Sequence, residues 1–115
     1  MKKSLALILC GLIMLLAACS GGSKPTSSGV KNEKVVKVGI SQLVEHPSLD
    51  AAREGFIAAL KDAGYVEGKN LKIDYQNAQG DVNTNMSIAQ KLVGEKNDLI
   101  LAIATSSAQA VVKST

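Results

Sequence analysis

The chain is poor in aromatic residues, cysteine and histidine, and each shortage excludes a class of protein. Tryptophan is absent, and aromatic side chains make up 3% of the 115 residues. Typical protein–protein interfaces are rich in aromatic residues, so the sequence gives little sign of such an interface. With one histidine, no paired Cys or His ligands, no Walker sequence and scattered acids, the chain offers no activated nucleophile, metal centre or phosphate loop. We therefore expect no enzyme activity and no cofactor or metal.

The excess of positive charge comes from the first few residues. Lys2 and Lys3 are two of the 13 basic residues, which face 10 acidic ones, so 11 basic residues remain without them. The rest of the chain is close to neutral. Because nucleic-acid binding needs Lys and Arg clustered on one face, we expect no nucleic-acid partner.

The first 18 residues follow the pattern of an export signal. Lys2 and Lys3 form a positive segment, residues 5–16 are largely apolar, and small residues then lead to Cys19. A membrane-spanning helix needs about 20 apolar residues, and this run is shorter. We predict a cleaved signal peptide over residues 1–18.

The sequence Leu16-Ala17-Ala18-Cys19 resembles a bacterial lipobox. This resemblance implies cleavage before Cys19 and lipidation of its thiol, and therefore anchoring at the extracytoplasmic face of the cell membrane. Residues 19–33 would be the acylated cysteine and a flexible linker, because Gly and Ser dominate them. The other cysteine, Cys10, lies in the predicted signal, so no disulfide is available to the remainder.

From residue 34 onward, strand and helix patterns alternate. Continuous or alternating apolar residues predict strands, and apolar residues at spacings of three and four predict helices. Strands are expected at residues 35–40, 71–75 and 98–104, and helices at 48–63, at 83–96 and from 105 onward. Pro47 favours the start of the first helix and Gly64 its end. Gly55, inside that helix, would be explained by a close contact with the sheet.

The order β-α-β-α-β-α predicts a three-layer α/β fold with a parallel sheet. The strand at 98–104 is the most hydrophobic and is expected at the centre of the sheet, whereas the alternating strand at 71–75 is expected near an edge. The loops at 41–47, 77–81 and 104–107 would share the edge formed by the carboxyl ends of the strands. Ligands of open parallel sheets bind at that edge.

Several segments resemble the start of an ABC transporter substrate-binding lipoprotein, in the group associated with tryptophan or tyrosine uptake. They are Val38-Gly39-Ile40-Ser41-Gln42-Leu43-Val44-Glu45-His46-Pro47-Ser48-Leu49-Asp50, Gly55-Phe56, Gly64-Tyr65-Val66-Glu67-Gly68-Lys69-Asn70 and Ala102-Ile103-Ala104-Thr105-Ser106-Ser107-Ala108-Gln109-Ala110. The resemblance implies that residues 34–115 form a partial N-terminal lobe of a type I periplasmic-binding-protein-like domain. Implied partners are an amino-acid ligand, an ABC permease and, through the lipid anchor, the membrane.

In that family two lobes close around the ligand, and this chain ends at Thr115 inside its third predicted helix. We expect a truncated gene product or an engineered fragment, with the second lobe absent from the chain. The alternatives are a surface lipoprotein with an adhesin or structural role and an exported α/β enzyme.

Ligand-binding residues are expected at the carboxyl edge of the sheet: Ser41, Gln42, Glu45, Thr105 and Ser106. The carboxylate of an amino acid needs donors, which a helix N-terminus at Thr105 and Ser106 would provide. The ammonium group needs an acid, and Glu45 and Asp50 are near. The Ser106 hydroxyl could instead cap the helix, because Ser106 and Gln109 have the spacing of a capping box.

Overall fold

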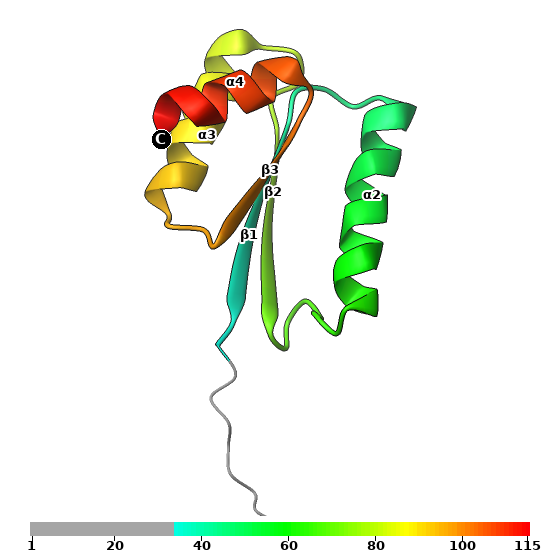
Figure 1. Cartoon of the computed structure of the whole chain (residues 1–115). Coiled ribbons are helices and arrows are strands. Elements are labelled where there is room, and N and C mark those ends of the chain that lie inside the picture. Colours follow the sequence, from blue (N-terminus) through cyan, green and yellow to red (C-terminus); the bar gives the residue numbers. More distant parts are fainter. Residues whose placement is uncertain (1–33) are drawn as a thin grey trace, which may run out of the picture. The chain divides into compact units, whose positions relative to one another are not determined.

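The structure, a computed structural model, describes residues 34–115, which form a parallel sheet between two layers of helices (Figure 1). The elements are β1 (Val36–Gln42), α2 (Pro47–Asp62), β2 (Leu71–Asn77), α3 (Val82–Gly94), β3 (Leu99–Ile103) and α4 (Thr105–Ser114). Helix α2 covers one face of the sheet, and α3 and α4 cover the other. The predicted α/β order is confirmed. The predicted signal peptide, Cys19 and the linker lie outside the described residues.

The strand order is β2-β1-β3, so β1 is the central strand. All pairings are parallel, and Val38 in β1 lies opposite Ile73 of β2 and Leu99 of β3. Parallel strands need long crossovers, which α2 and α3 supply. Within residues 34–115, no helix is long and apolar enough to cross a membrane.

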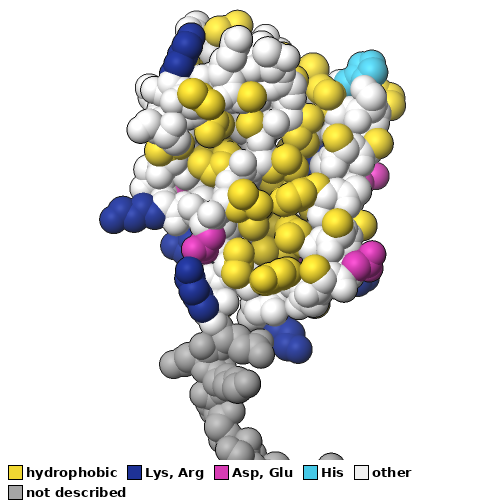
Figure 2. All heavy atoms as spheres, viewed as in Figure 1, with side chains coloured by type: hydrophobic (Ala, Val, Ile, Leu, Met, Phe, Trp, Pro, Cys, Tyr) yellow, Lys and Arg dark blue, Asp and Glu magenta, His cyan; other side chains and the backbone are white. Residues whose placement is uncertain are grey.

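The prediction that the third strand is central is wrong. In the described part of the chain β3 pairs with β1 alone and forms an edge, and Leu99 is 49% exposed. Figure 2 shows apolar side chains gathered on this side of the molecule, between α2 and α4. A continuous apolar run indicates burial on both faces, but pairing partners are distant in sequence and the run does not reveal them. The prediction that 71–75 lies near an edge is confirmed.

Side-chain alternation along β1 divides the core in two. Val38 and Ile40 point toward α2 and pack with Leu71, Ile103 and the partly buried Phe56. On the opposite face, Leu92 and Ile88 of α3 form a second cluster with Ala78, Leu43 and Ile100.

The predicted loop at 41–47 begins two residues later than expected, because β1 continues through Gln42.

Local signals set the ends of the first two helices. Pro47 is the first residue of α2, and the imidazole of His46 caps it by accepting a hydrogen bond from the Ser48 N–H at 3.3 Å. Gly64 follows the helix with φ of +91°, the left-handed conformation that favours glycine. Asp81 caps α3 through the Thr84 N–H at 2.6 Å. The boundary predictions at Pro47 and Gly64 are confirmed.

The predicted close contact at Gly55 is wrong. Gly55 is exposed, and a Cβ atom placed there would meet nothing within 4 Å. Gly39 of β1 is the glycine with close neighbours: its Cβ would lie 3.0 Å from Leu92 Cδ2 and 3.1 Å from Asn97 Nδ2. The helix therefore carries the cost of glycine without a packing reason for it.

We predict that Gly55→Ala raises the free energy of unfolding by about 0.5–1 kcal/mol, because alanine loses less backbone entropy in a helix. Gly39→Ala should lower it by about 1–3 kcal/mol through overpacking against Leu92. Urea unfolding of the full chain, followed by circular dichroism, measures both. Equal effects of the two substitutions would contradict this account of the glycines.

Candidate functional site

The three strands end side by side at one edge of the sheet. Gln42 lies opposite Asn77 of β2 and Ile103 of β3. The loop after β2 is held to the end of β1 by two backbone hydrogen bonds, from Ala78 N–H to the Gln42 carbonyl at 2.9 Å and from Gly80 N–H to the Leu43 carbonyl at 2.8 Å. All five predicted ligand-binding residues lie in or next to this carboxyl edge.

Gln42 is buried and organises the start of α2. Its side-chain amide donates to the Val44 carbonyl and to Asp50 Oδ1, both at 2.8 Å, and its amide oxygen accepts from Arg53 Nη1 at 3.2 Å. Both amide hydrogens are therefore in use. Direct contact between Gln42 and a ligand stays a prediction, and the observed bonds give the side chain a positioning role.

Arg53 holds Asp50 in the same network. Its Nη1 lies 3.2 Å from Asp50 Oδ1, and its guanidinium carbon is 4.4 Å from the centroid of the Tyr75 ring. Asp50, one of the two acids considered for a ligand ammonium, is thus already paired. Glu45 is exposed and makes no ion pair with any residue in 34–115. Sequence analysis missed Arg53, although its i,i+3 spacing from Asp50 is a signal for such a pair.

Ser41 carries an unpaired hydroxyl at this edge. Its side chain is fully buried, and its Oγ is the buried side-chain oxygen or nitrogen that lacks a hydrogen-bond partner in the described part of the chain. Ser41 lies between Gln76 and Ala102 of the flanking strands. Buried polar groups are nearly always paired, so this hydroxyl is a candidate contact for a ligand or a bound water.

The N-terminus of α4 has no side-chain cap. The capping position is Ala104, with φ of +85° and ψ of 151°, a region that only glycine adopts without strain of order 1–3 kcal/mol. The predicted capping box is wrong, because Ser106 is the second residue of the helix. Thr105 and Ser106 are exposed. Their N–H groups have no partner within the helix and can receive an anion such as a carboxylate.

A buried polar pair fixes α4 against α3. Ser107 Oγ donates to Asn85 Oδ1 at 3.0 Å, and Asn85 Nδ2 donates to the Ser106 carbonyl at 3.0 Å. Asn85 of α3 is 2% exposed, and it was not among the residues expected to matter from the sequence. The sequence pattern could not reveal that Asn85 bonds to Ser107, because the two residues are 22 positions apart.

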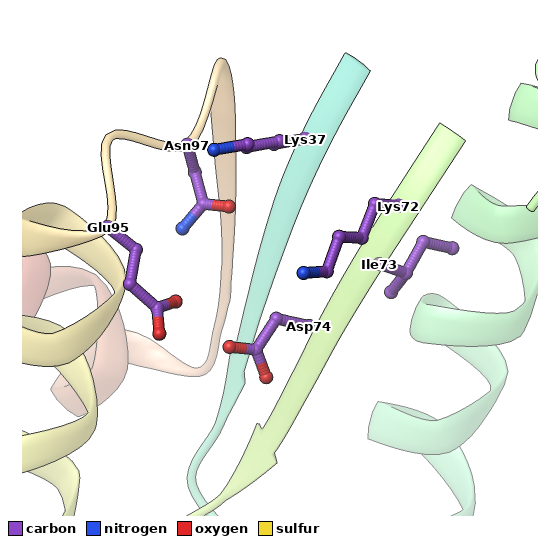
Figure 3. Close-up of a pocket in the computed structure, with 6 residues that line it drawn as sticks. All are labelled: Lys37, Lys72, Ile73, Asp74, Glu95 and Asn97. Carbon is purple, nitrogen blue, oxygen red and sulfur yellow. The ribbon is translucent and has the colours of Figure 1, made fainter. Parts of the chain in front are cut away.

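A hollow lined largely by charged residues lies away from the carboxyl edge. It measures about 360 Å³ and is lined by Lys37, Lys72, Ile73, Asp74, Glu95 and Asn97 (Figure 3). Another, of about 390 Å³, runs along the exposed side of α4 from Thr105 to Lys113. Residues 34–115 contain no group of three or more His, Cys, Asp or Glu side chains that could hold a metal ion.

Comparison with known families gives a match over most of the chain. The model of the family described as ABC transporter substrate binding protein matches residues 37–115. The chain is also 52% identical to the tyrosine-binding protein of Clostridioides difficile (strain R20291). That alignment covers 99% of this chain and 35% of the relative, so the chain spans about a third of the relative's length.

Solved structures agree with the match. A ligand-free, open substrate-binding protein with adhesive properties from Clostridium difficile is 56% identical with a TM-score of 0.69, over 70% of this chain and 28% of that one. A conserved domain protein from Vibrio cholerae is 51% identical with a TM-score of 0.70, over 71% and 28%. An ABC domain in complex with L-Trp from Streptococcus pneumonia is 38% identical with a TM-score of 0.67, over 70% and 27%.

Replacing each of the two buried serines of this site by alanine should have different effects on the free energy of unfolding. We predict that Ser107→Ala lowers the free energy of unfolding by about 1–3 kcal/mol, because Asn85 Oδ1 loses its donor inside the protein. Ser41→Ala should leave it unchanged or raise it, because the lost hydroxyl has no partner. Urea unfolding of the full chain measures both. A loss at Ser41→Ala as large as that at Ser107→Ala would mean that Ser41 Oγ has a stabilising partner.

Proposed function

Because the chain belongs to the family of ABC transporter substrate-binding proteins, we propose that it is the lipid-anchored solute-binding component of an importer for an aromatic amino acid. The relative that binds tyrosine and the solved relative that holds L-Trp support this ligand class. The cargo would be captured outside the membrane by closure of two lobes and delivered to the permease. The lipobox at Leu16–Cys19 supports the anchor.

The observation that carries the ligand assignment is the uncapped N-terminus of α4. It presents free N–H groups and the exposed hydroxyls of Thr105 and Ser106 at the carboxyl edge of the sheet. The positive end of the helix dipole favours an anion there. We assign the α-carboxylate of the amino acid to this helix end, next to the unpaired hydroxyl of Ser41.

The ammonium group of the ligand needs an acid, and Glu45 suits that role better than Asp50. Glu45 is exposed on the same edge, whereas Asp50 is engaged by Gln42 and Arg53. Breaking the Asp50 pair to bind a ligand would leave Arg53 with only the more distant and exposed Glu54, whose Oε1 lies 3.7 Å from Arg53 Nη2. The Gln42 and Arg53 network would then act by holding the loop that carries Glu45 in place.

Adhesion is a second candidate function. The solved relative from Clostridium difficile that is described as having adhesive properties favours it. The apolar surface between α2 and α4 (Figure 2), with Leu99 and Val112 exposed at 49% and 73%, offers a contact area for such a role. Adhesion predicts binding to cells or cell walls that does not depend on amino acids.

Calorimetric titration of a chimera tests the transport function. The chimera carries residues 34–115 of this chain in place of the matching segment of the Clostridioides difficile tyrosine-binding protein. We expect saturable binding of tyrosine or tryptophan and no binding of leucine. No heat of binding with tyrosine, tryptophan or phenylalanine would overturn the assignment of an aromatic ligand. The unmodified relative serves as the positive control.

Hydroxyl deletions in the same chimera test the α4 site. We predict that Thr105→Val and Ser106→Ala each weaken binding about ten- to hundredfold, as expected for the loss of one hydrogen bond to a charged group. The backbone N–H groups remain, so binding should not be abolished. Ser87→Ala, an exposed serine of α3, is the matched control and should bind like the parent. Unchanged affinity in both site variants would place the carboxylate elsewhere.

A further inference from the structure

The two edges of the sheet carry opposite charge. Between residues 34 and 115 there are nine basic and nine acidic side chains. Six of the basic side chains lie at the amino edge, at the starts of strands or the ends of helices: Lys34, Lys37, Lys61, Lys69, Lys72 and Lys96. Four of the acids share that edge: Asp62, Glu67, Glu95 and Asp98. The amino edge therefore has a net charge of +2. At the carboxyl edge Arg53 faces four acids, which are Glu45, Asp50, Glu54 and Asp81.

Helix dipoles account for some of these lysines but not for all. Lys61 lies in the last turn of α2, and Lys96 follows α3, where cations offset the negative end of a helix. The lysines at the strand starts have no such role. Lys34 pairs with Asp98 at 2.8 Å. The other three, Lys37, Lys69 and Lys72, form no ion pair with any described residue.

Lys37 and Lys72 are direct neighbours. They are opposite each other in the β1/β2 register, and like charges in that position are destabilising. Figure 3 shows both side chains on the side of the sheet that faces Glu95 and Asn97, lining the cavity of about 360 Å³. The two acids in that cavity, Asp74 and Glu95, are both engaged by Lys91. The lysine pair therefore lacks a counter-charge of its own within the described structure.

We propose that the amino edge of the sheet docks on the anionic headgroups of a membrane, with Lys37, Lys69 and Lys72 as its contacts. The proposal rests on the lipid anchor proposed above for proximity, but it does not depend on the ligand. The polypeptide enters the domain at this edge, through Lys34. A linker of about fifteen residues, the length predicted for residues 19–33, would have an end-to-end distance of roughly 20 Å if it behaves as a flexible Gly/Ser chain.

Electrostatic attraction to the membrane acts close to its surface. Polybasic surfaces next to an anchor are drawn to anionic lipids, and the attraction falls off within a Debye length of about 8–10 Å. A domain held within a few tens of ångströms of the lipid samples that layer repeatedly. Docking by the amino edge would turn the acidic carboxyl edge, with Glu45 and the N-terminus of α4, toward the solvent, where it can capture solute.

Lysine footprinting of the full chain on vesicles tests the proposal. The 115-residue chain is added to phosphatidylcholine vesicles and to vesicles in which about a third of the lipid is phosphatidylglycerol, and acetylation at each lysine is followed by mass spectrometry. We expect Lys37, Lys69 and Lys72 to react several-fold more slowly on the anionic vesicles, relative to Lys91, and high salt to remove the difference. Equal rates on the two kinds of vesicle would overturn the proposal.

Matched charge variants separate docking from total charge. Lys72→Gln and Asn83→Glu each lower the net charge by one, the first at the amino edge and the second at an exposed position near the carboxyl edge. We expect Lys72→Gln to reduce the protection of Lys37 and Lys69 several-fold, and Asn83→Glu to leave it unchanged. Protection of Lys37 by inorganic phosphate without vesicles would show a free-anion site and overturn membrane docking. Amino-acid binding is not measured in these experiments, so their outcome is independent of the transport function.

Discussion

The structure depends on the burial of β1 between two strands and two layers of helices. Four of its residues are at most 1% exposed: Val38, Ile40, Ser41 and Gln42. Hydrogen bonds to β2 and β3 satisfy its backbone on both sides, which a buried strand requires. The same strand carries the core at its beginning and middle and the polar residues of the candidate site at its end. Changes in its packing therefore act directly on the site.

The polarity of the site follows from how helices and strands alternate in this fold. Helices α2 and α3 run opposite to the strands, and α4 begins directly after β3, so the N-termini of α2, α3 and α4 gather at the carboxyl edge (Figure 1). Two of these termini are capped internally, by His46 and Asp81, and α4 is left without a side-chain cap. One helix end is thus free to bind an anion, while lysines collect at the opposite edge.

Much of the fold could be predicted because its signals are local. Pro47 and Gly64 act on the helix that each adjoins, and both were placed correctly from the sequence. Gathering Ser41, Gln42, Thr105 and Ser106 at one edge needed only the rule for parallel sheets. The roles of these residues were harder to predict. The bonds of Gln42 to Asp50 and Arg53 depend on the orientation of α2. The bond of Asn85 to Ser107 joins two helices that pack on the same face of the sheet but are separated by β3 in the sequence.

By itself, the sequence determined the alternation of strands and helices, most of their boundaries, the parallel sheet and the resemblance to substrate-binding lipoproteins. Each of these follows from residue periodicity or from short motifs, which are local features of the chain. Only the tertiary structure decided that β1 is central and β3 an edge, that Gln42 and Asp50 are engaged while Ser41 lacks a partner, and that six lysines share one edge. These features depend on pairing between segments tens of residues apart. The free energy of such contacts comes from burial and from hydrogen bonds that form only when the layers assemble.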